Sequence, residues 1–304
     1  MTDLKKYIRK RFFPHLWCPG CGHGTVLNAM IRSIDGLGLK KNEIVLVSGI
    51  GCSARMSGYL DFHTLHTLHG RALAFATGVK MSRPELTIIV PMGDGDATAI
   101  GGNHLIHAAR RNIDITVLIM NNRIYGMTGG QFSPLSGCGI EATTAPYTTI
   151  DSAFNAVELA KGAGATFVAR GTTYHVNELE RLITQAIEHR GFSVVEVLSQ
   201  CPTYYGRKND AGDAVAMMEH YRDNTVKLKR GENGGGRENR SEADRSRANA
   251  DQGSQSKIPI GIFRSEERTE YCDAYRSQVI EPAARRMGHQ APEPEDALVK
   301  GQTE

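Results

Sequence analysis

Strand-like and helix-like segments alternate from Glu43 to Leu198, and this alternation is the feature that most restricts the fold. The strand-like segments are short, nearly all apolar and rich in β-branched residues, which is typical of strands buried on both faces. They are Glu43–Ser48, Leu86–Pro91, Ile115–Met120, Thr166–Arg170 and Ser193–Leu198. The helical segments between them are Arg71–Met81, Ala99–Arg111, Ser152–Lys161 and Val176–His189. We therefore predict an α/β fold with a mostly parallel sheet, helices on both faces, and a ligand site beyond the carboxyl ends of the strands.

Charge and composition argue against several classes of protein. A formal net charge of +3 over 304 residues is too small to indicate a nucleic-acid partner or an acidic membrane surface. No apolar run approaches the ~20 residues that span a bilayer. The basic segment Met1–Phe13 is not followed by the apolar stretch of a secretory signal, and six cysteines are too sparse for a disulfide scaffold. We expect a cytoplasmic protein.

The composition changes after about Leu228. The stretch Arg230–Lys257 is rich in Gly, Asn, Ser, Arg and Glu and nearly lacks large apolar side chains, which predicts a disordered linker. The short apolar segment Ile258–Phe263 is expected to dock on the domain or on a partner, and Gln290–Glu304 is expected to be a loose tail. The expected organisation is a cofactor-binding domain over residues 1–228, a linker over 229–257, and a docking segment with a tail over 258–304.

An acidic glycine motif, Gly93-Asp94-Gly95-Asp96, follows the second predicted strand. Glycine lets the backbone approach a ligand closely, and a carboxylate binds a hard cation that bridges two phosphates. Asn121-Asn122 follows the next strand, and parallel pairing would bring Asp94 and Asn122 to the same edge of the sheet. This combination predicts a magnesium and diphosphate site, although the glycine motif alone is equally compatible with a simple turn.

Four cysteines lie at the ends of predicted strands or in loops. Cys18 and Cys21 form a Cys-x-x-Cys pair, Cys52 follows the first predicted strand, and Cys201 precedes a proline after the last one. Four thiolates bind either a structural zinc ion or an iron–sulfur cluster, and the spacing does not separate these two kinds of site.

A longer segment after the glycine motif reads Asn122-Arg123-Ile124-Tyr125-Gly126-Met127-Thr128-Gly129-Gly130-Gln131. With Gly93-Asp94-Gly95 it resembles the β subunits of the 2-oxoacid:ferredoxin oxidoreductases, and the 2-oxoglutarate branch more than the pyruvate branch. The resemblance covers about Trp17 to Lys208. It implies a thiamine-diphosphate-binding fold with two metal centres. The implied magnesium ligands are the side chains of Asp94 and Asn122 and the backbone carbonyl of Ile124, and the implied [4Fe–4S] ligands are Cys18, Cys21, Cys52 and Cys201.

The same resemblance implies a set of residues around the cofactor. The set consists of Gly49, Gly51, Ser53, His69, Gly93, Asp94, Gly95, Asp96, Asn122, Ile124, Tyr125, Gly126 and Thr128. His69 and Arg55 are the candidates for catalytic contacts: segments like that around His69 line the cofactor side in the family, and a guanidinium fork suits a second substrate carboxylate. A solvated loop charge is the equally weighted interpretation of Arg55.

The histidine repeat and the two remaining cysteines are not expected to form sites of their own. His63, His66 and His69 recur at every third residue, but this spacing drifts around a helix, so we expect ordinary hydrogen-bonded histidines instead of a metal triad. Cys138 and Cys272 are expected to be free thiols.

The implied reaction is the oxidative decarboxylation of 2-oxoglutarate to succinyl-CoA, with coenzyme A as the acyl acceptor and ferredoxin as the electron acceptor. A cluster accepts electrons one at a time, which zinc cannot do. Thiamine enzymes also use a glutamate that, in this family, belongs to a separate pyrimidine-binding domain. This chain shows no second domain of that kind, so we expect a partner α subunit to supply the glutamate. The alternatives are a pyruvate or branched 2-oxoacid oxidoreductase, a non-oxidative thiamine lyase, and a non-catalytic metal-binding electron carrier.

Overall fold

The computed structural model describes residues 4–228 and 257–288, which form one eight-stranded sheet in the order β2-β1-β3-β4-β6-β5-β8-β7. The strands are β1 (Ile44–Ser48), β2 (His63–His66), β3 (Thr87–Gly93), β4 (Ile115–Asn121), β5 (Phe167–Thr172), β6 (Phe192–Leu198), β7 (Thr225–Lys227) and β8 (Ile258–Ser265). Neighbouring strands run parallel, except that β5 and β8 are antiparallel. The predicted α/β fold with a mostly parallel sheet is confirmed.

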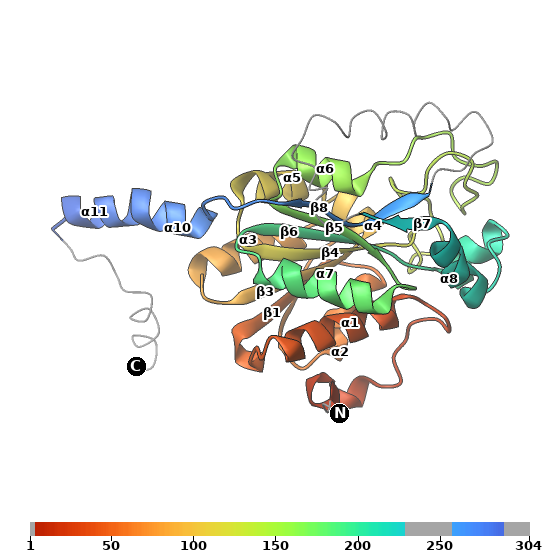
Figure 1. Cartoon of the computed structure of the whole chain (residues 1–304), viewed down its shortest axis with the longest axis horizontal. Helices are drawn as coiled ribbons and strands as arrows, with labels where there is room; N and C mark the ends of the chain where they lie inside the picture. Colours follow the sequence, from red (N-terminus) through yellow and green to blue (C-terminus); the bar gives the residue numbers. More distant parts are fainter. Residues whose placement is uncertain (1–3, 229–256, 289–304) are drawn as a thin grey trace.

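Helices cover both faces of this sheet. The α-helices are α1 (His23–Gly36), α2 (Met56–Tyr59), α3 (Ala72–Ser82), α4 (Asp94–Thr98), α5 (Gly102–Arg111), α6 (Ala156–Ala163), α7 (Val176–Glu188), α8 (Ala214–Asp223), α10 (Tyr271–Tyr275) and α11 (Glu281–Arg286). In Figure 1, α1 and α7 lie along one face of the sheet, and α5 and α6 lie along the other. Successive side chains of β4 alternate between the two cores: Leu118 and Met120 pack with α1 and α7, and Val117 and Ile119 pack on the opposite side.

The five predicted strands are confirmed as β1, β3, β4, β5 and β6, with ends that shift by at most two residues. The helix predicted over Ala99–Arg111 is wrong at its start, because the chain first forms α4 and then turns before α5 begins at Gly102. A Cβ atom on Gly101 would overlap with the backbone carbonyl of Asp96, so this turn requires glycine.

The histidine repeat lies on a strand and a turn. His63 and His66 are the two ends of the edge strand β2, and both are exposed. His69 follows in the turn that leads to α3 and is the one member of the repeat that reaches the ligand site.

The apolar segment Ile258–Phe263 docks back onto the domain as part of β8, which pairs with β5. Residues on both sides of positions 229–256 therefore build the same sheet. The predicted linker Arg230–Lys257, apart from Lys257 itself, and the predicted tail Gln290–Glu304 lie outside the described residues. Beyond β8, α10 and α11 extend away from the sheet (Figure 1).

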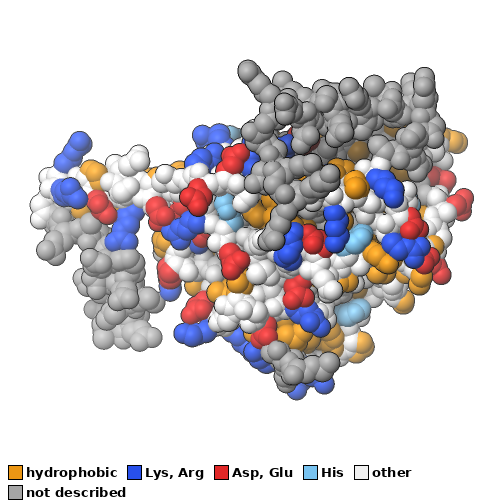
Figure 2. All heavy atoms as spheres, in the orientation of Figure 1, with side chains coloured by type: hydrophobic (Ala, Val, Ile, Leu, Met, Phe, Trp, Pro, Cys, Tyr) orange, Lys and Arg blue, Asp and Glu red, His pale blue; other side chains and the backbone are white. Residues whose placement is uncertain are grey.

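The surface agrees with the small net charge of the chain. Figure 2 shows basic and acidic side chains interspersed over the visible face. Among the residues that the structure describes, no helix combines the length and the apolar character needed to cross a membrane.

Candidate cofactor site

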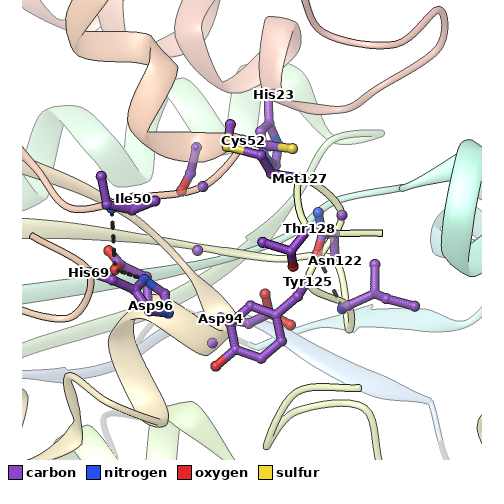
Figure 3. Close-up of a pocket in the computed structure, with 16 residues that line it drawn as sticks. His23, Ile50, Cys52, His69, Asp94, Asp96, Asn122, Tyr125, Met127 and Thr128 are labelled. Carbon is purple, nitrogen blue, oxygen red and sulfur yellow. Dashed lines mark hydrogen bonds and ion pairs between the residues drawn. The ribbon is translucent and has the colours of Figure 1, made fainter. Parts of the chain in front are cut away.

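A cavity opens where the parallel strands β3 and β4 end. Gly93 on β3 lies opposite Met120 on β4, so the residues that follow these strands emerge side by side. The cavity has a volume of about 180 Å³, and its lining is drawn in Figure 3. The lining residues are His23, Ile50, Gly51, Cys52, Ser53, His69, Gly93, Asp94, Gly95, Asp96, Asn122, Ile124, Tyr125, Gly126, Met127 and Thr128.

All of the residues predicted around the cofactor except Gly49 line this one cavity. Gly49 lies just behind it, where a Cβ atom would overlap with the carboxylate of Asp96. Arg55 is not among the lining residues. It ends the short turn after Cys52. Burial and the neighbouring thiols Cys201 and Cys18 raise the pKa of the Cys52 thiol to about 11, although the positive charge of Arg55 opposes that rise. The structure therefore does not place Arg55 where the predicted substrate contact would be.

Asp94 is the first residue of α4 and is buried. Ser133 Oγ donates a 2.6 Å hydrogen bond to Asp94 Oδ2, and the backbone N–H groups of Gly95 and Arg123 also favour the charged carboxylate. Burial nevertheless raises the pKa of Asp94 to about 7, because it penalises the charge more strongly than these donors stabilise it. A cation bound at this carboxylate would supply the missing positive charge.

Side-chain hydrogen bonds fix the loop that follows β4. Asn121 Oδ1 accepts from the backbone N–H of Arg123 at 3.2 Å, and Asn122 Oδ1 accepts from that of Ile124 at 3.3 Å. Arg123 has a φ of +61°, a left-handed conformation that is uncommon for residues other than glycine. Ser136 Oγ donates to the Arg123 carbonyl at 2.6 Å and holds the loop from outside. The loop thus presents Asn122 and Ile124 at the cavity in a defined conformation.

Asp96 holds the second polar group of the cavity, His69. Nδ1 of His69 lies 2.6 Å from Asp96 Oδ1, a distance that fits an ion pair, although the ring is not oriented for a directed hydrogen bond. The backbone N–H of Gly70 donates to the same carboxylate oxygen at 2.7 Å. Burial raises the pKa of Asp96, while Gly70 and His69 oppose that rise. Figure 3 shows Asp96 and His69 together on one side of the cavity.

The segment Tyr125–Gln131 closes on itself as a tight hairpin. The backbone N–H of Tyr125 donates to the carbonyl of Gln131 at 2.8 Å, and that of Gly130 donates to the carbonyl of Tyr125 at 2.9 Å. Gly129 and Gly130 have φ values of +109° and +92°, which explains the two glycines of the Thr-Gly-Gly-Gln sequence. The hydroxyl of Thr128, which lines the cavity, hydrogen-bonds to the Gln131 side chain.

Three buried polar atoms of lining residues have no hydrogen-bond partner within residues 4–228 and 257–288. They are Ser53 Oγ, His69 Nδ1 and Asp96 Oδ2. Because buried polar groups in folded proteins are nearly always hydrogen-bonded, these atoms indicate that the cavity takes a polar ligand. The Ser53 hydroxyl can donate to an anionic oxygen such as that of a phosphate, and the Asp96 oxygen requires a donor.

The four predicted cluster cysteines lie near one another beside the cavity. Cys52 lines the cavity, and its Sγ and that of Cys201 would lie 3.6 and 3.8 Å from a Cβ atom built on Gly126. Burial, together with the charges of Cys201, Cys52 and Cys18, raises the pKa of the Cys21 thiol to about 12. Cys18 is exposed, whereas Cys201 is buried. The set therefore reaches from the cavity to the protein surface.

No group of three or more His, Cys, Asp or Glu side chains in the described part of the chain is arranged to hold one metal ion. Magnesium is usually held through one or two carboxylates together with phosphate oxygens and water. A site at Asp94 and Asn122 would therefore be completed by the diphosphate.

His23 is the lining residue with titratable chemistry that the sequence interpretation missed. It is the first residue of α1, and burial lowers its pKa to about 4, which leaves a neutral imidazole near pH 7. Its ring packs edge-on against Trp17 with the ring centroids 5.8 Å apart. The sequence feature that could have pointed to His23 is its position two residues after Cys21, at the start of α1, a helix that we did not predict. Figure 3 shows His23 beside Cys52 and Met127.

Comparisons with known proteins agree with this geometry. The model of the thiamine pyrophosphate enzyme C-terminal TPP-binding domain matches residues 49–197. The 2-oxoglutarate synthase subunit KorB of Methanothermobacter marburgensis is 45% identical over 92% of this chain and 93% of its own length. The KorB subunit of Archaeoglobus fulgidus is 43% identical over 90% of this chain and 92% of its own length.

A solved structure matches the complete chain. It is the 2-oxoglutarate:ferredoxin oxidoreductase from Magnetococcus marinus with 2-oxoglutarate, coenzyme A and succinyl-CoA bound. It superposes with a TM-score of 0.80 at 31% identity, covering 100% of this chain and 97% of the solved chain. The chain therefore belongs to the KorB family, the β subunits of the thiamine-diphosphate-dependent 2-oxoacid:ferredoxin oxidoreductases.

Proposed function

We propose that this chain is the β subunit of an enzyme that oxidatively decarboxylates 2-oxoglutarate to succinyl-CoA and passes the electrons to ferredoxin. The observation that carries the proposal is the presence of Asp94 and Cys52 in the lining of one cavity. Asp94 belongs to the predicted metal and diphosphate site, and Cys52 belongs to the predicted cluster set. A thiamine lyase that releases no electrons has no use for the second group.

Asp94, Asn122 and Ile124 are proposed to hold magnesium, through two side chains and one backbone carbonyl. Ser53 is proposed to donate its hydroxyl proton to a diphosphate oxygen, since Ser53 Oγ otherwise has no partner among the described residues. Thr128 is proposed to line the diphosphate, with its own hydroxyl proton donated to Gln131 Oε1. Thiamine diphosphate, when bound, supplies the electron sink that makes decarboxylation of a 2-oxoacid feasible. The protein contributes position and charge: the bonds of Ser133 and Ser136 hold the Asp94 carboxylate and the loop after β4 in place.

His69 is proposed to contact the reacting part of the substrate. Its Nδ1 lies 2.6 Å from Asp96 Oδ1, so the carboxylate lies against the ring at the cavity. Gly49 permits this arrangement because a side chain there would displace the carboxylate. Ile50 and Met127 border the cavity with apolar surface that limits the access of water.

Cys18, Cys21, Cys52 and Cys201 are proposed to bind a [4Fe–4S] cluster. Burial and the neighbouring thiols disfavour ionisation of Cys21 and Cys52, and a cationic iron centre would favour their thiolate forms. The cluster would accept electrons singly and pass them outward past the exposed Cys18. Unpaired cysteines and a cluster of this kind suit the reducing conditions of the cytoplasm.

The proposed substrate is supported by relatives and by the lining itself. The KorB relatives carry the name 2-oxoglutarate synthase, and the matching solved enzyme has 2-oxoglutarate bound. No lining residue in the described part of the chain is Lys or Arg. We therefore infer that the partner subunit supplies the cation for the second carboxylate of 2-oxoglutarate, as well as the glutamate that thiamine enzymes use.

Apolar side chains at and near the cavity support a covered site. Ile50 and Met127, which line the cavity, are 41% and 39% exposed, and Leu68 and Ile100, which flank the turn at Gly70, are 67% and 49% exposed. Exposed apolar patches of this kind mark contact surfaces. We propose that the α subunit packs here and closes the cofactor site between the two chains.

The test is anaerobic co-purification of the chain with its α subunit, followed by assays of ferredoxin and viologen reduction with several 2-oxoacids. We expect coenzyme A-dependent reduction that is fastest with 2-oxoglutarate, and no comparable rate from the chain alone. A preference for pyruvate would favour the pyruvate branch. Iron-free protein with decarboxylase activity would favour a thiamine lyase, and iron-containing protein that binds no thiamine diphosphate would favour an electron carrier.

A further inference from the structure

A buried ion pair lies next to the loop that carries the proposed metal ligands. Arg170 on β5 and Glu196 on β6 are direct partners in the sheet register, and their side chains meet with Nε 2.6 Å from Oε2. Arg170 is 8% exposed and Glu196 is 2% exposed. Burying two charges removes their hydration, and apolar residues of similar volume often stabilise a fold equally well. A pair of this kind therefore invites a functional explanation.

Glu196 connects the pair to the metal-binding loop. Its Oε1 accepts a 2.7 Å hydrogen bond from Nδ2 of Asn121, the last residue of β4. The other end of the same amide, Oδ1, accepts from the backbone N–H of Arg123. The Asn121 side chain thus bridges Glu196 and the residue whose left-handed conformation sets the course of the loop. Asn122 and Ile124, the proposed magnesium ligands, lie on either side of that residue.

Arg170 connects the pair to the C-terminal strand. Its guanidinium lies over the ring of Phe263 on β8, 5.4 Å from the centroid, and Nη1 reaches the carbonyl of Pro259 at 3.5 Å. Nη2 donates to Asn155 Oδ1 at 2.9 Å, which ties the same side chain to the start of α6. In the sheet, Arg170 pairs with Gly261 of β8. The position of the Arg170 guanidinium therefore depends on β8, which begins at Ile258.

We propose that Arg170 and Glu196 are positioning residues for the magnesium and diphosphate loop, and that β8 is part of the cofactor site because it holds Arg170. The series of side-chain contacts runs from Phe263 and Pro259 through Arg170 and Glu196 to the amide of Asn121. Outer contacts that orient metal ligands commonly contribute about 10- to 100-fold to metal affinity. The inference rests on the proposed magnesium and diphosphate site.

A second ion pair, with a buried lysine and a partly exposed aspartate, supplies a control. Lys80 Nζ lies 2.7 Å from Asp114 Oδ2, and Lys80 is 2% exposed. Asp114 directly precedes β4, so this pair supports the amino end of the strand whose carboxyl end carries Asn121. Lys80 Nζ also donates to the carbonyl of Leu86 at 2.8 Å, which is likewise at the amino ends of the strands. Breaking this pair should destabilise the fold without reaching the cofactor loop.

The experiment uses the complete complex with the α subunit, stripped of magnesium and thiamine diphosphate. The variants are Glu196→Ala, Glu196→Gln, Arg170→Met and Lys80→Met. For each variant, the magnesium concentration for half-maximal binding of thiamine diphosphate is measured by equilibrium dialysis, and the midpoint of thermal unfolding is measured without ligand. Steady-state rates over a magnesium titration separate KM for magnesium from kcat.

We expect Glu196→Ala and Arg170→Met to raise the magnesium requirement about tenfold or more, with kcat largely recovered at saturating magnesium. Glu196→Gln should recover part of the affinity, because its amide oxygen can still accept from Asn121 Nδ2. Lys80→Met should lower the unfolding midpoint while changing the magnesium requirement less than about twofold. A magnesium requirement that is unchanged in Glu196→Ala, or that rises in Lys80→Met as much as in Glu196→Ala, would overturn the inference.

A milder variant keeps the test decisive if Arg170→Met fails to fold. Phe263→Leu removes only the ring from the guanidinium, and it should raise the magnesium requirement by about threefold, because the cation–π contact that helps to hold Arg170 is lost. An unchanged requirement in this variant would also count against a role for β8. Failure of the unsubstituted complex to bind thiamine diphosphate with magnesium would instead contradict the proposed function.

Discussion

The aromatic ring of Tyr125 occupies the space into which a side chain on Gly95 would project, so a larger residue at position 95 would force the ring or the backbone to move. Glycine at this position of the Gly-Asp-Gly motif therefore suits the hairpin after β4 as well as the ligand. Gly95→Ala should destabilise the chain by about 1–3 kcal/mol and weaken binding of thiamine diphosphate, because the ring or the backbone of α4 must move. Thermal unfolding and cofactor titration measure both effects.

Gly102→Ala is the matched control for that substitution. Gly102 is the first residue of α5, and a Cβ atom there would have no neighbour within 4 Å. It should leave cofactor binding unchanged. Equal effects of Gly95→Ala and Gly102→Ala on cofactor affinity would contradict the steric argument.

Asp94→Asn should abolish most activity, because it removes the only carboxylate among the proposed magnesium ligands. Ser133→Ala should weaken magnesium binding by roughly tenfold, since Ser133 Oγ positions Asp94 Oδ2 and outer contacts contribute on that scale. A magnesium titration of activity separates the two variants: excess magnesium should rescue Ser133→Ala and should not rescue Asp94→Asn. Full rescue of Asp94→Asn would show that the carboxylate is not a ligand.

The cysteines divide into a set that should hold iron and a pair that should not. Substitution of Cys52 or Cys201 by Ser should lower the iron content and the rate of ferredoxin reduction together, because both sulfurs lie beside Gly126 at the cavity. Cys138→Ser should change neither quantity, since Cys138 is exposed and is not a residue of the cavity lining. Iron analysis of anaerobically purified complexes tests this, and iron loss on substitution of Cys138 would contradict the assignment.

Cys138 and Cys272 should differ in reactivity. Burial raises the pKa of the Cys272 thiol to about 12, whereas Cys138 is exposed. Since the thiolate is the reactive form, an alkylating reagent should label Cys138 first and Cys272 only on unfolding. Mass spectrometry of the native complex after brief alkylation would detect this order, and early labelling of Cys272 would show that its site opens.

Acidification should destabilise the fold partly through His189. Burial lowers the pKa of His189 from its ordinary 6.5, and its Nε2 lies 2.7 Å from Thr166 Oγ1. A lowered pKa in the folded state means that this contribution to stability is complete above pH 6.5 and is lost as the pH falls from there towards the folded-state pKa. The unfolding midpoint of His189→Gln should therefore drop less than that of the unsubstituted protein between pH 7 and pH 5, a range of about two pH units that spans the ordinary histidine pKa. An identical drop would exclude this contribution.

The strands, the ligand edge and the local motifs could be predicted from the sequence because each depends on residues close together in the chain. The strands depend on continuous apolar runs, and the cavity position depends on where Gly93 and Asn122 follow those runs. The start of α6 was missed by four residues. Asn155 caps the helix by accepting from the backbone N–H of Glu158, so α6 begins at Ala156 and not at Ser152.

The remaining features depend on contacts between distant residues. Phe263 lies over Arg170 because β8 pairs with β5. Residues 229–256 precede β8 in the sequence, and no local pattern there encodes that pairing. The place of His23 in the cavity lining was missed because it depends on distant contacts, with Trp17 and with Ser199 after the end of β6. The exclusion of Arg55 from the cavity depends on the direction of a short turn after Cys52, which the residue types alone do not determine.

The central claim is that the thiamine site and the cysteine set form one electron-transfer unit. It is tested most directly by electron paramagnetic resonance of the anaerobic, oxidised complex after addition of 2-oxoglutarate and coenzyme A without ferredoxin. The account predicts a reduced-cluster signal that appears with substrate and is missing in both Asp94→Asn and Cys52→Ser. Consumption of 2-oxoglutarate with no such signal, or an undiminished signal in Cys52→Ser, would contradict it.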